Sequence, residues 1–94
     1  MGLVINFLGN PNIELNGKSV AFPLQKAEVA VLCAAFSGPV TRARLTSLLW
    51  PVKEEDKARA NLRNALYLIR AALPGHVETD RRGFALKDFS TDLE

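Results

Sequence analysis

The sequence predicts an α+β domain in which short strands at both ends flank three helices. Near the N-terminus, the dipeptide Asn16-Gly17 separates two short alternating runs, and this is typical of a tight β-hairpin. Between residues 24 and 73 the apolar residues instead recur every three to four positions, as in amphipathic helices. The chain has 94 residues, of which 48% are hydrophobic, so we expect a single domain over residues 1–94 with one modest core.

Residues 1–22 are expected to form an antiparallel sheet. A first strand spans residues 3–8, and a hairpin joins residues 13–15 to residues 18–22 through the Asn-Gly turn. A two-residue turn places Leu15 opposite Lys18 and Ile13 opposite Val20. This register gathers four apolar side chains on one face of the sheet: Ile13, Leu15, Val20 and Phe22.

Three helices are expected within residues 24–73. The first spans 24–36 and ends at Ser-Gly-Pro, and the second follows Thr41, which can cap it. The third spans about 57–72, with Asp56 as its predicted N-cap and Pro-Gly after it. The expected buried stripe of the first helix is Leu24, Ala27, Val31, Leu32, Ala35 and Phe36, with Cys33 as an inert core thiol, and that of the second is Leu45, Leu48 and Leu49.

The third helix has two contrasting faces. Leu62, Leu66, Ile69 and Leu73 form a core stripe bordered by Ala58 and Ala65. The other face carries guanidinium, amide and phenol groups, and the helix has no acid beyond its first turn. Arginine can bind guanine O6 and N7 together, asparagine can bind adenine N6 and N7, and arginine or tyrosine can bind a phosphate. The candidate DNA-binding residues on this helix are Arg59, Arg63, Asn64, Tyr67 and Arg70.

A second hairpin is expected after the helices, with strands at 77–79 and 83–86. Val77, Thr79, Phe84 and Leu86 would share one face, and Gly83 is available for a left-handed turn position. Arg81 and Arg82 lie at the exposed tip, where they can reach a phosphate or a narrow minor groove. Three helices followed by a β-hairpin wing are the winged helix-turn-helix arrangement. The expected parts are therefore an N-terminal antiparallel sheet (1–22), three helices (24–73) and a C-terminal wing (77–86).

The positive charge is concentrated in one segment. The net charge of the chain is only +2, but residues 57–82 hold six basic side chains against two acidic ones, a net charge of +4. A local phosphate-binding surface requires such a concentration. We therefore expect sequence-specific binding of double-stranded DNA, with the helix at about 57–72 in the major groove and residues 79–84 on the adjacent backbone or minor groove.

Three further residues are weaker candidates for DNA contact. Arg42 and Arg44 lie in the first turn of the second helix, where an anion would also meet free N–H groups, although an ordinary surface position explains each of them somewhat better. Trp50 could donate its indole N–H to a phosphate, or it could plug the edge of the core.

Five segments together resemble a known family: LLWP (48–51), ARANLRNAL (58–66), LIRAAL (68–73), VET (77–79) and GFAL (83–86). They are similar to the N-terminal domain of bacterial transcriptional activators of the antibiotic-regulatory (SARP) type, which is related to the winged helix of OmpR/PhoB-like response regulators. The resemblance covers nearly the whole chain. It implies a four-stranded N-terminal sheet, a third helix that reads DNA, and binding as a homodimer or in tandem on direct repeats.

The resemblance also implies a second partner. In such domains the loop before the recognition helix can face RNA polymerase, and here that loop carries Lys53, Glu54, Glu55 and Asp56. Solvation and helix capping explain the three acids equally well. Because relatives continue into an effector region after the wing, the resemblance leaves open that this chain is a domain of a longer regulator.

The sequence also bears on two other classes of function. A winged-helix module that binds protein is the alternative, supported by the apolar N-terminal sheet and by Tyr67 and Leu68. An enzyme is disfavoured, because one histidine, one cysteine and no Gly-rich phosphate loop offer few ways to build a catalytic site, and no metal or other cofactor is expected. One cysteine, no signal peptide and no apolar run near the ~20 residues of a membrane span predict a cytoplasmic location without membrane contact.

Overall fold

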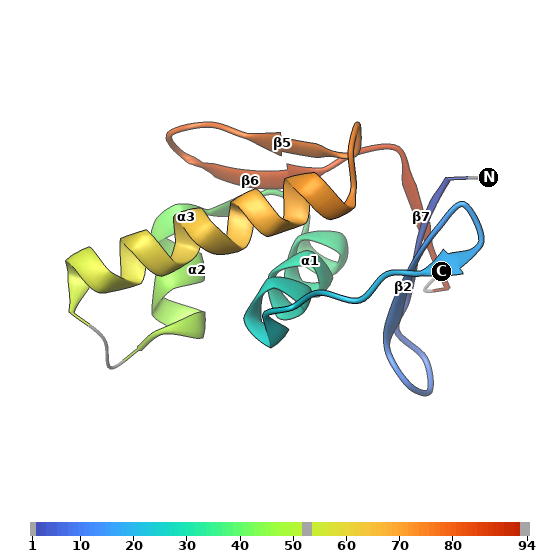
Figure 1. Cartoon of the computed structure of the whole chain (residues 1–94), viewed down its shortest axis with the longest axis horizontal. Helices are drawn as coiled ribbons and strands as arrows, with labels where there is room; N and C mark the ends of the chain where they lie inside the picture. The colour runs from blue at the N-terminus through green and yellow to red at the C-terminus, as the bar shows by residue number, and fades with distance from the viewer. Residues whose placement is uncertain (1, 52–53, 93–94) are drawn as a thin grey trace.

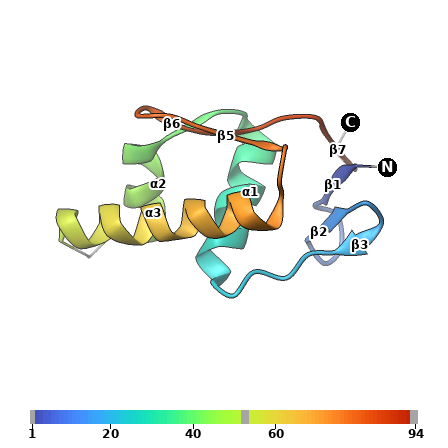
Figure 2. The same ribbon diagram turned by 45° about the horizontal axis from the view of Figure 1, so that its top comes forward.

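The part of the chain that the structure describes folds into three helices and two small sheets (Figures 1 and 2). The computed structural model describes residues 2–51 and 54–92. The helices are α1 (Gln25–Ser37), α2 (Arg42–Leu49) and α3 (Glu55–Ala72). The strands are β1 (Leu3–Asn6), β2 (Asn12–Leu15), β3 (Lys18–Ser19), β4 (Val40–Thr41), β5 (Val77–Thr79), β6 (Gly83–Leu86) and β7 (Phe89–Thr91). The fold class is therefore α+β.

The first sheet has the order β3-β2-β1-β7 and joins the two ends of the chain. The Asn-Gly turn is as predicted: Asn16 and Gly17 have φ of 54° and 86°, and Leu15 lies opposite Lys18. The expectation of a purely antiparallel sheet is wrong, because β7 pairs with β1 in parallel. This strand brings the segment after the second hairpin back to the N-terminus, where the Asp92 carboxylate accepts hydrogen bonds from the backbone N–H groups of Phe7 and Leu8.

The second sheet has the order β4-β6-β5 and contains the hairpin expected at 77–86. Val77 lies opposite Leu86 and Thr79 opposite Phe84, which gives these four side chains the common face that was predicted. Strand β4, immediately before α2, was not predicted, and it pairs with β6 through Val40↔Phe84 and Thr41↔Gly83. The hairpin is therefore attached to the start of α2.

Gly83 has a different role from the one expected. Its φ is not positive, but a Cβ atom built on it would lie 2.0 Å from the carbonyl oxygen of Val40. Glycine is required here because two backbones approach each other closely, and not because the turn is left-handed.

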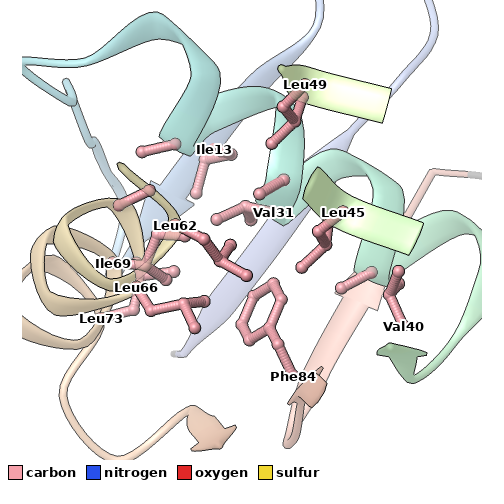
Figure 3. Close-up of a cluster of buried hydrophobic side chains, with 14 of the residues drawn as sticks. Ile13, Val31, Val40, Leu45, Leu49, Leu62, Leu66, Ile69, Leu73 and Phe84 are labelled. Carbon is pink, nitrogen blue, oxygen red and sulfur yellow. The ribbon is translucent and has the colours of Figure 1, made fainter. Parts of the chain in front are cut away.

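All three helices bury one face in a common core (Figure 3). The buried residues of α3 are those of the predicted stripe, and Leu73 directly after the helix is buried with them; Leu62, Ile69 and Leu73 are at most 1% exposed. Figure 3 shows the ring of Phe84 from β6 pointing toward the leucines of α3 and toward Leu45 of α2. Burying a side chain of this size stabilises the fold by about 1.5–3 kcal/mol, so helices and hairpin hold one another in place.

Three predicted core positions are wrong. Phe36 is 73% exposed, because it lies nine residues, or about two and a half helical turns, from the buried Ala27 and so on the opposite side of α1. Its ring instead makes an edge contact with Phe7 at 6.1 Å between centroids. Leu48 is 52% exposed on the outer side of α2, and Cys33 is only half-buried.

The helix ends also differ in part from expectation. Thr41 caps α2, since its hydroxyl accepts a hydrogen bond from the backbone N–H of Arg44. The predicted N-cap of α3 is wrong: the helix begins two residues earlier at Glu55, and Glu54 occupies the cap position without a side-chain hydrogen bond. Asp56 lies in the first turn, where its charge still suits the helix dipole.

None of the helices in the described ranges is long and apolar enough to cross a membrane.

The close contact at Gly83 predicts a sharp mutational effect. Replacing Gly83 by Ala should destabilise the fold by about 1–3 kcal/mol, because the new methyl group must push apart β4 and β6. Urea unfolding followed by circular dichroism measures this. Ser90→Ala in the exposed middle of β7 is the control and should leave the midpoint almost unchanged. Equal midpoints for both variants would contradict the packing argument.

Candidate nucleic-acid interface

The exposed face of α3 carries the basic residues that the sequence singled out. Arg59, Arg63, Asn64, Tyr67 and Arg70 are all exposed, and Tyr67 is 68% exposed. Arg59, Arg63, Tyr67 and Arg70 follow one another at spacings of four, four and three residues, which places them along one stripe. At about 1.5 Å per residue, the stripe is roughly 16 Å long. Ala60 and Ala71 beside it are also exposed and leave the helix backbone accessible.

An open groove connects this helix to the hairpin. Its volume is about 780 Å³, with Arg70 contributed by α3 and Arg82 by the hairpin tip. The remaining lining comes from the two hairpin strands, from Asp80 at the tip and from residues 39–41 before α2. In Figures 1 and 2 the hairpin extends alongside α3, with its tip toward the N-terminal half of the helix. The groove thus brings together two guanidinium groups that belong to different elements.

A second hollow, of about 480 Å³, lies between α2 and the start of α3 and is lined by Arg42 and Arg59. A hydrogen bond links the linings of the two hollows, because Nε of Arg42 donates to the backbone carbonyl of Asp80, which lines the first groove. Four of the predicted arginines therefore border one or other of the two hollows: Arg42, Arg59, Arg70 and Arg82.

The hairpin tip is held by the side chain of Asp80. One of its carboxylate oxygens accepts hydrogen bonds from the backbone N–H groups of Arg82 (2.8 Å) and Gly83 (2.9 Å). The hydrogen bonds from Gly83 and Arg82 hold the pKa of Asp80 below its usual value of 3.8, with a smaller contribution from the charges of Arg82 and Arg42. Sequence reasoning missed this role, although an Asp three residues before a Gly at a turn is a recognisable signal.

The two acids that line the groove, Glu78 and Asp80, have partners within the protein, whereas its two arginines, Arg70 and Arg82, form no ion pair with a described residue. Glu78 pairs with Lys87 at 3.8 Å, Asp56 pairs with Arg59 at 2.7 Å, and Asp80 binds backbone amides. Among the residues that the structure describes, Arg63, Arg70, Arg81 and Arg82 form no ion pair. The Arg59–Asp56 pair is exposed and spans one helical turn, so it is worth only about 0.3–0.5 kcal/mol and gives way readily to a phosphate.

Two of the weaker candidates take different positions. Arg44 is exposed in the first turn of α2, at the helix end where a phosphate would approach. Trp50 is only 6% exposed, so the structure favours its role as a core plug and we remove it from the proposed contact surface. The centre of its ring lies 5.2 Å from Nζ of Lys26. The same ammonium group donates a hydrogen bond to the carbonyl of Leu49, the last residue of α2.

The loop that the family resemblance assigns to RNA polymerase is only partly described. Lys53 lies outside the described residues. Glu54, Glu55 and Asp56 are exposed, but Glu54 pairs with Lys57 at 3.8 Å and Asp56 with Arg59. Ion pairing therefore accounts for two of the three acids, and the polymerase contact stays a prediction.

Comparisons with known proteins add nothing to this assignment, since neither a protein-family model nor a curated protein matches the chain. Within residues 2–51 and 54–92, no three His, Cys, Asp or Glu side chains lie together as a metal site requires.

The low pKa of Asp80 predicts how the tip responds to acid. A carboxyl group with a pKa lowered by folding stabilises the folded tip above pH 3.8, and this contribution is lost as the pH falls through the folded-state pKa. The protection factors of the Arg82 and Gly83 amides against hydrogen exchange should therefore fall in that range, and in Asp80→Ala they should be low at neutral pH as well. Asp92→Ala removes a similar carboxylate from the other sheet and should leave these two amides unchanged. Slow exchange in Asp80→Ala would contradict the role of this side chain.

Proposed function

We propose that this chain is a winged-helix domain that binds double-stranded DNA in a sequence-specific manner and regulates transcription in the bacterial cytoplasm. One observation carries the proposal: Arg70 of α3 and Arg82 of the hairpin tip line the same open groove, and neither forms an ion pair among the described residues. A helix and a basic wing that meet in this way match the two parts of a winged-helix contact. The motifs shared with the antibiotic-regulatory activators support the same assignment.

In the proposed complex α3 enters the major groove with its exposed stripe. The stripe of about 16 Å spans a major groove that is about 12 Å wide. Arg63 lies near its middle with Asn64 beside it, so these two side chains are the best placed to reach base edges. The exposed alanines on this face let the helix backbone approach the bases closely.

The hairpin tip makes the second contact. Arg81 and Arg82 are exposed at a turn whose backbone is fixed by Asp80, so binding orders few further atoms there. Contacts from such a tip reach the DNA backbone or the adjacent minor groove and contribute mainly sequence-independent affinity. Arg44 at the start of α2 supplies a third point of contact with a phosphate.

A winged-helix module that binds protein is the second candidate, and the exposure of Tyr67 favours it, since tyrosine is common at protein interfaces. The two candidates differ in their response to polyanions. If the chain passes through both heparin and duplex-DNA columns at low salt, the DNA assignment is wrong and the protein-binding function is favoured.

Base-reading arginines predict losses that depend on sequence. Arg63→Ala or Arg70→Ala should weaken binding to a duplex selected from a random DNA pool by about 1–3 kcal/mol, and weaken binding to a mixed-sequence duplex much less. Fluorescence anisotropy measures both affinities. Lys18→Ala is the matched control, because it removes an exposed charge from β3 in the other sheet and should change neither affinity. Wild-type affinity in both arginine variants would remove α3 from the interface.

A phosphate-binding wing predicts losses that do not depend on sequence. Arg81→Ala should weaken binding to every duplex by the same factor and reduce the slope of log K against log salt concentration by about one. The same titrations at several salt concentrations measure this slope. An unchanged slope would show that Arg81 does not meet a phosphate.

A further inference from the structure

Arg42 connects α2 to the hairpin tip. It is the first residue of α2, and its backbone N–H donates to the carbonyl of Arg82 at 2.8 Å. Its side chain also binds the hairpin tip, because Nε donates to the backbone carbonyl of Asp80 at 2.7 Å. These two bonds lie directly beyond the last pair of the β4–β6 ladder, Thr41↔Gly83. The tip of the hairpin is therefore bound to the helix next to it by a single residue.

The backbone carbonyl of Asp80 can accept the hydrogen bond from Arg42 because the turn does not use it. In an ordinary β-turn the N–H of the fourth residue donates to the carbonyl of the first. Here the N–H of Gly83 donates to the carboxylate of Asp80 instead, at 2.9 Å. The backbone carbonyl of Asp80 is thereby left for Arg42, and the hydrogen bond from a charged donor is among the stronger kinds.

A hairpin of this size needs such a support. Two strands of three and four residues are marginal alone, and loop tips are the first parts of a fold to open. Arg81 and Arg82 must be ordered in any complex, and ordering them at the moment of binding would reduce affinity. A tip that is already fixed relative to α2 and α3 avoids that cost.

We propose that Arg42 is a positioning residue, which holds the hairpin tip so that Arg81 and Arg82 meet the DNA backbone at the same time as α3 enters the groove. This inference rests on the proposed function. It differs from the expectation that Arg42 itself contacts a phosphate, because the guanidinium acts through the hairpin. A positioning role predicts that the effects of Arg42 and Arg81 are coupled, whereas two independent phosphate contacts give additive effects.

A double-mutant cycle on the 94-residue chain tests this, with a mixed-sequence DNA duplex as the probe. Arg42→Gln and Arg81→Ala should each weaken binding by about tenfold, the effect of losing one charge-assisted hydrogen bond. The double variant should bind about as weakly as the weaker single variant, because a displaced tip has already lost the contact of Arg81. Arg44→Gln is the matched control: it removes the same charge from the same turn but has no bond to the hairpin, so with Arg81→Ala it should be additive.

Two further measurements distinguish a positioning role of Arg42 from an effect of its charge and from unfolding of the domain. Arg42→Lys keeps the charge but lacks the Nε donor, so it should show the same coupling with Arg81→Ala as the glutamine variant. Amide exchange of Arg82 and Gly83 in the free protein should accelerate in both Arg42 variants but not in Arg44→Gln, while the urea midpoint shows that all of them remain folded.

The outcomes distinguish this inference from the function on which it rests. An additive cycle for Arg42→Gln and Arg81→Ala, or wild-type affinity in Arg42→Lys, overturns the positioning role and leaves DNA binding intact. Failure of the unsubstituted chain to bind the duplex at low salt overturns both.

Discussion

The approach of Gly83 to Val40 is the constraint on which the arrangement of the helices and hairpin depends. Any side chain at Gly83 would collide with the carbonyl oxygen of Val40, so only glycine lets β4 and β6 pair. That pairing sets the start of α2, since β4 runs directly into the helix. It also sets Phe84, which pairs with Val40 and carries its ring into the core against α3 (Figure 3). One backbone contact thus positions the hairpin against two helices.

The parts of the fold that could be predicted are those whose signals are local. The Asn-Gly turn needs positive φ at both residues, and both have it; the period of α3 follows from its own residues. The strands β4 and β7 could not be predicted, because neither is joined to its partner strand by a short turn, whereas the equally short β3 and β5 belong to hairpins with recognisable turns. Each exists only because a distant strand supplies its hydrogen bonds, β6 for β4 and β1 for β7.

The same distinction applies to the candidate site. The exposed arginine face of α3 follows from helical periodicity alone, and the exposed tip at Arg81 and Arg82 follows from turn chemistry. That Arg70 and Arg82 share a groove depends on the β4–β6 contact and could not be read from either segment. The position of Trp50 could not be predicted either. Its side chain has a polar and an apolar part and therefore fits a surface or a core, and only the packing of the folded chain places it in the core.

The charge pattern of α3 forgoes ion pairs that would stabilise the helix in the isolated domain. An exposed helix gains about 0.2–0.5 kcal/mol from each Glu–Lys or Asp–Arg pair one turn apart. No acid lies three or four residues from either Arg63 or Arg70, because those positions hold Arg59, Ala60, Leu66, Tyr67, Leu73 and Pro74. The acids of α3 are confined to its first turn, where they favour the dipole and engage Arg59. A helix under selection for stability alone would place glutamates among these arginines, whereas a helix that meets a polyanion must exclude them, since each acid would repel the phosphates. The absence of such acids from the face that carries Arg63 and Arg70 is therefore the feature that a neutral protein partner explains least well.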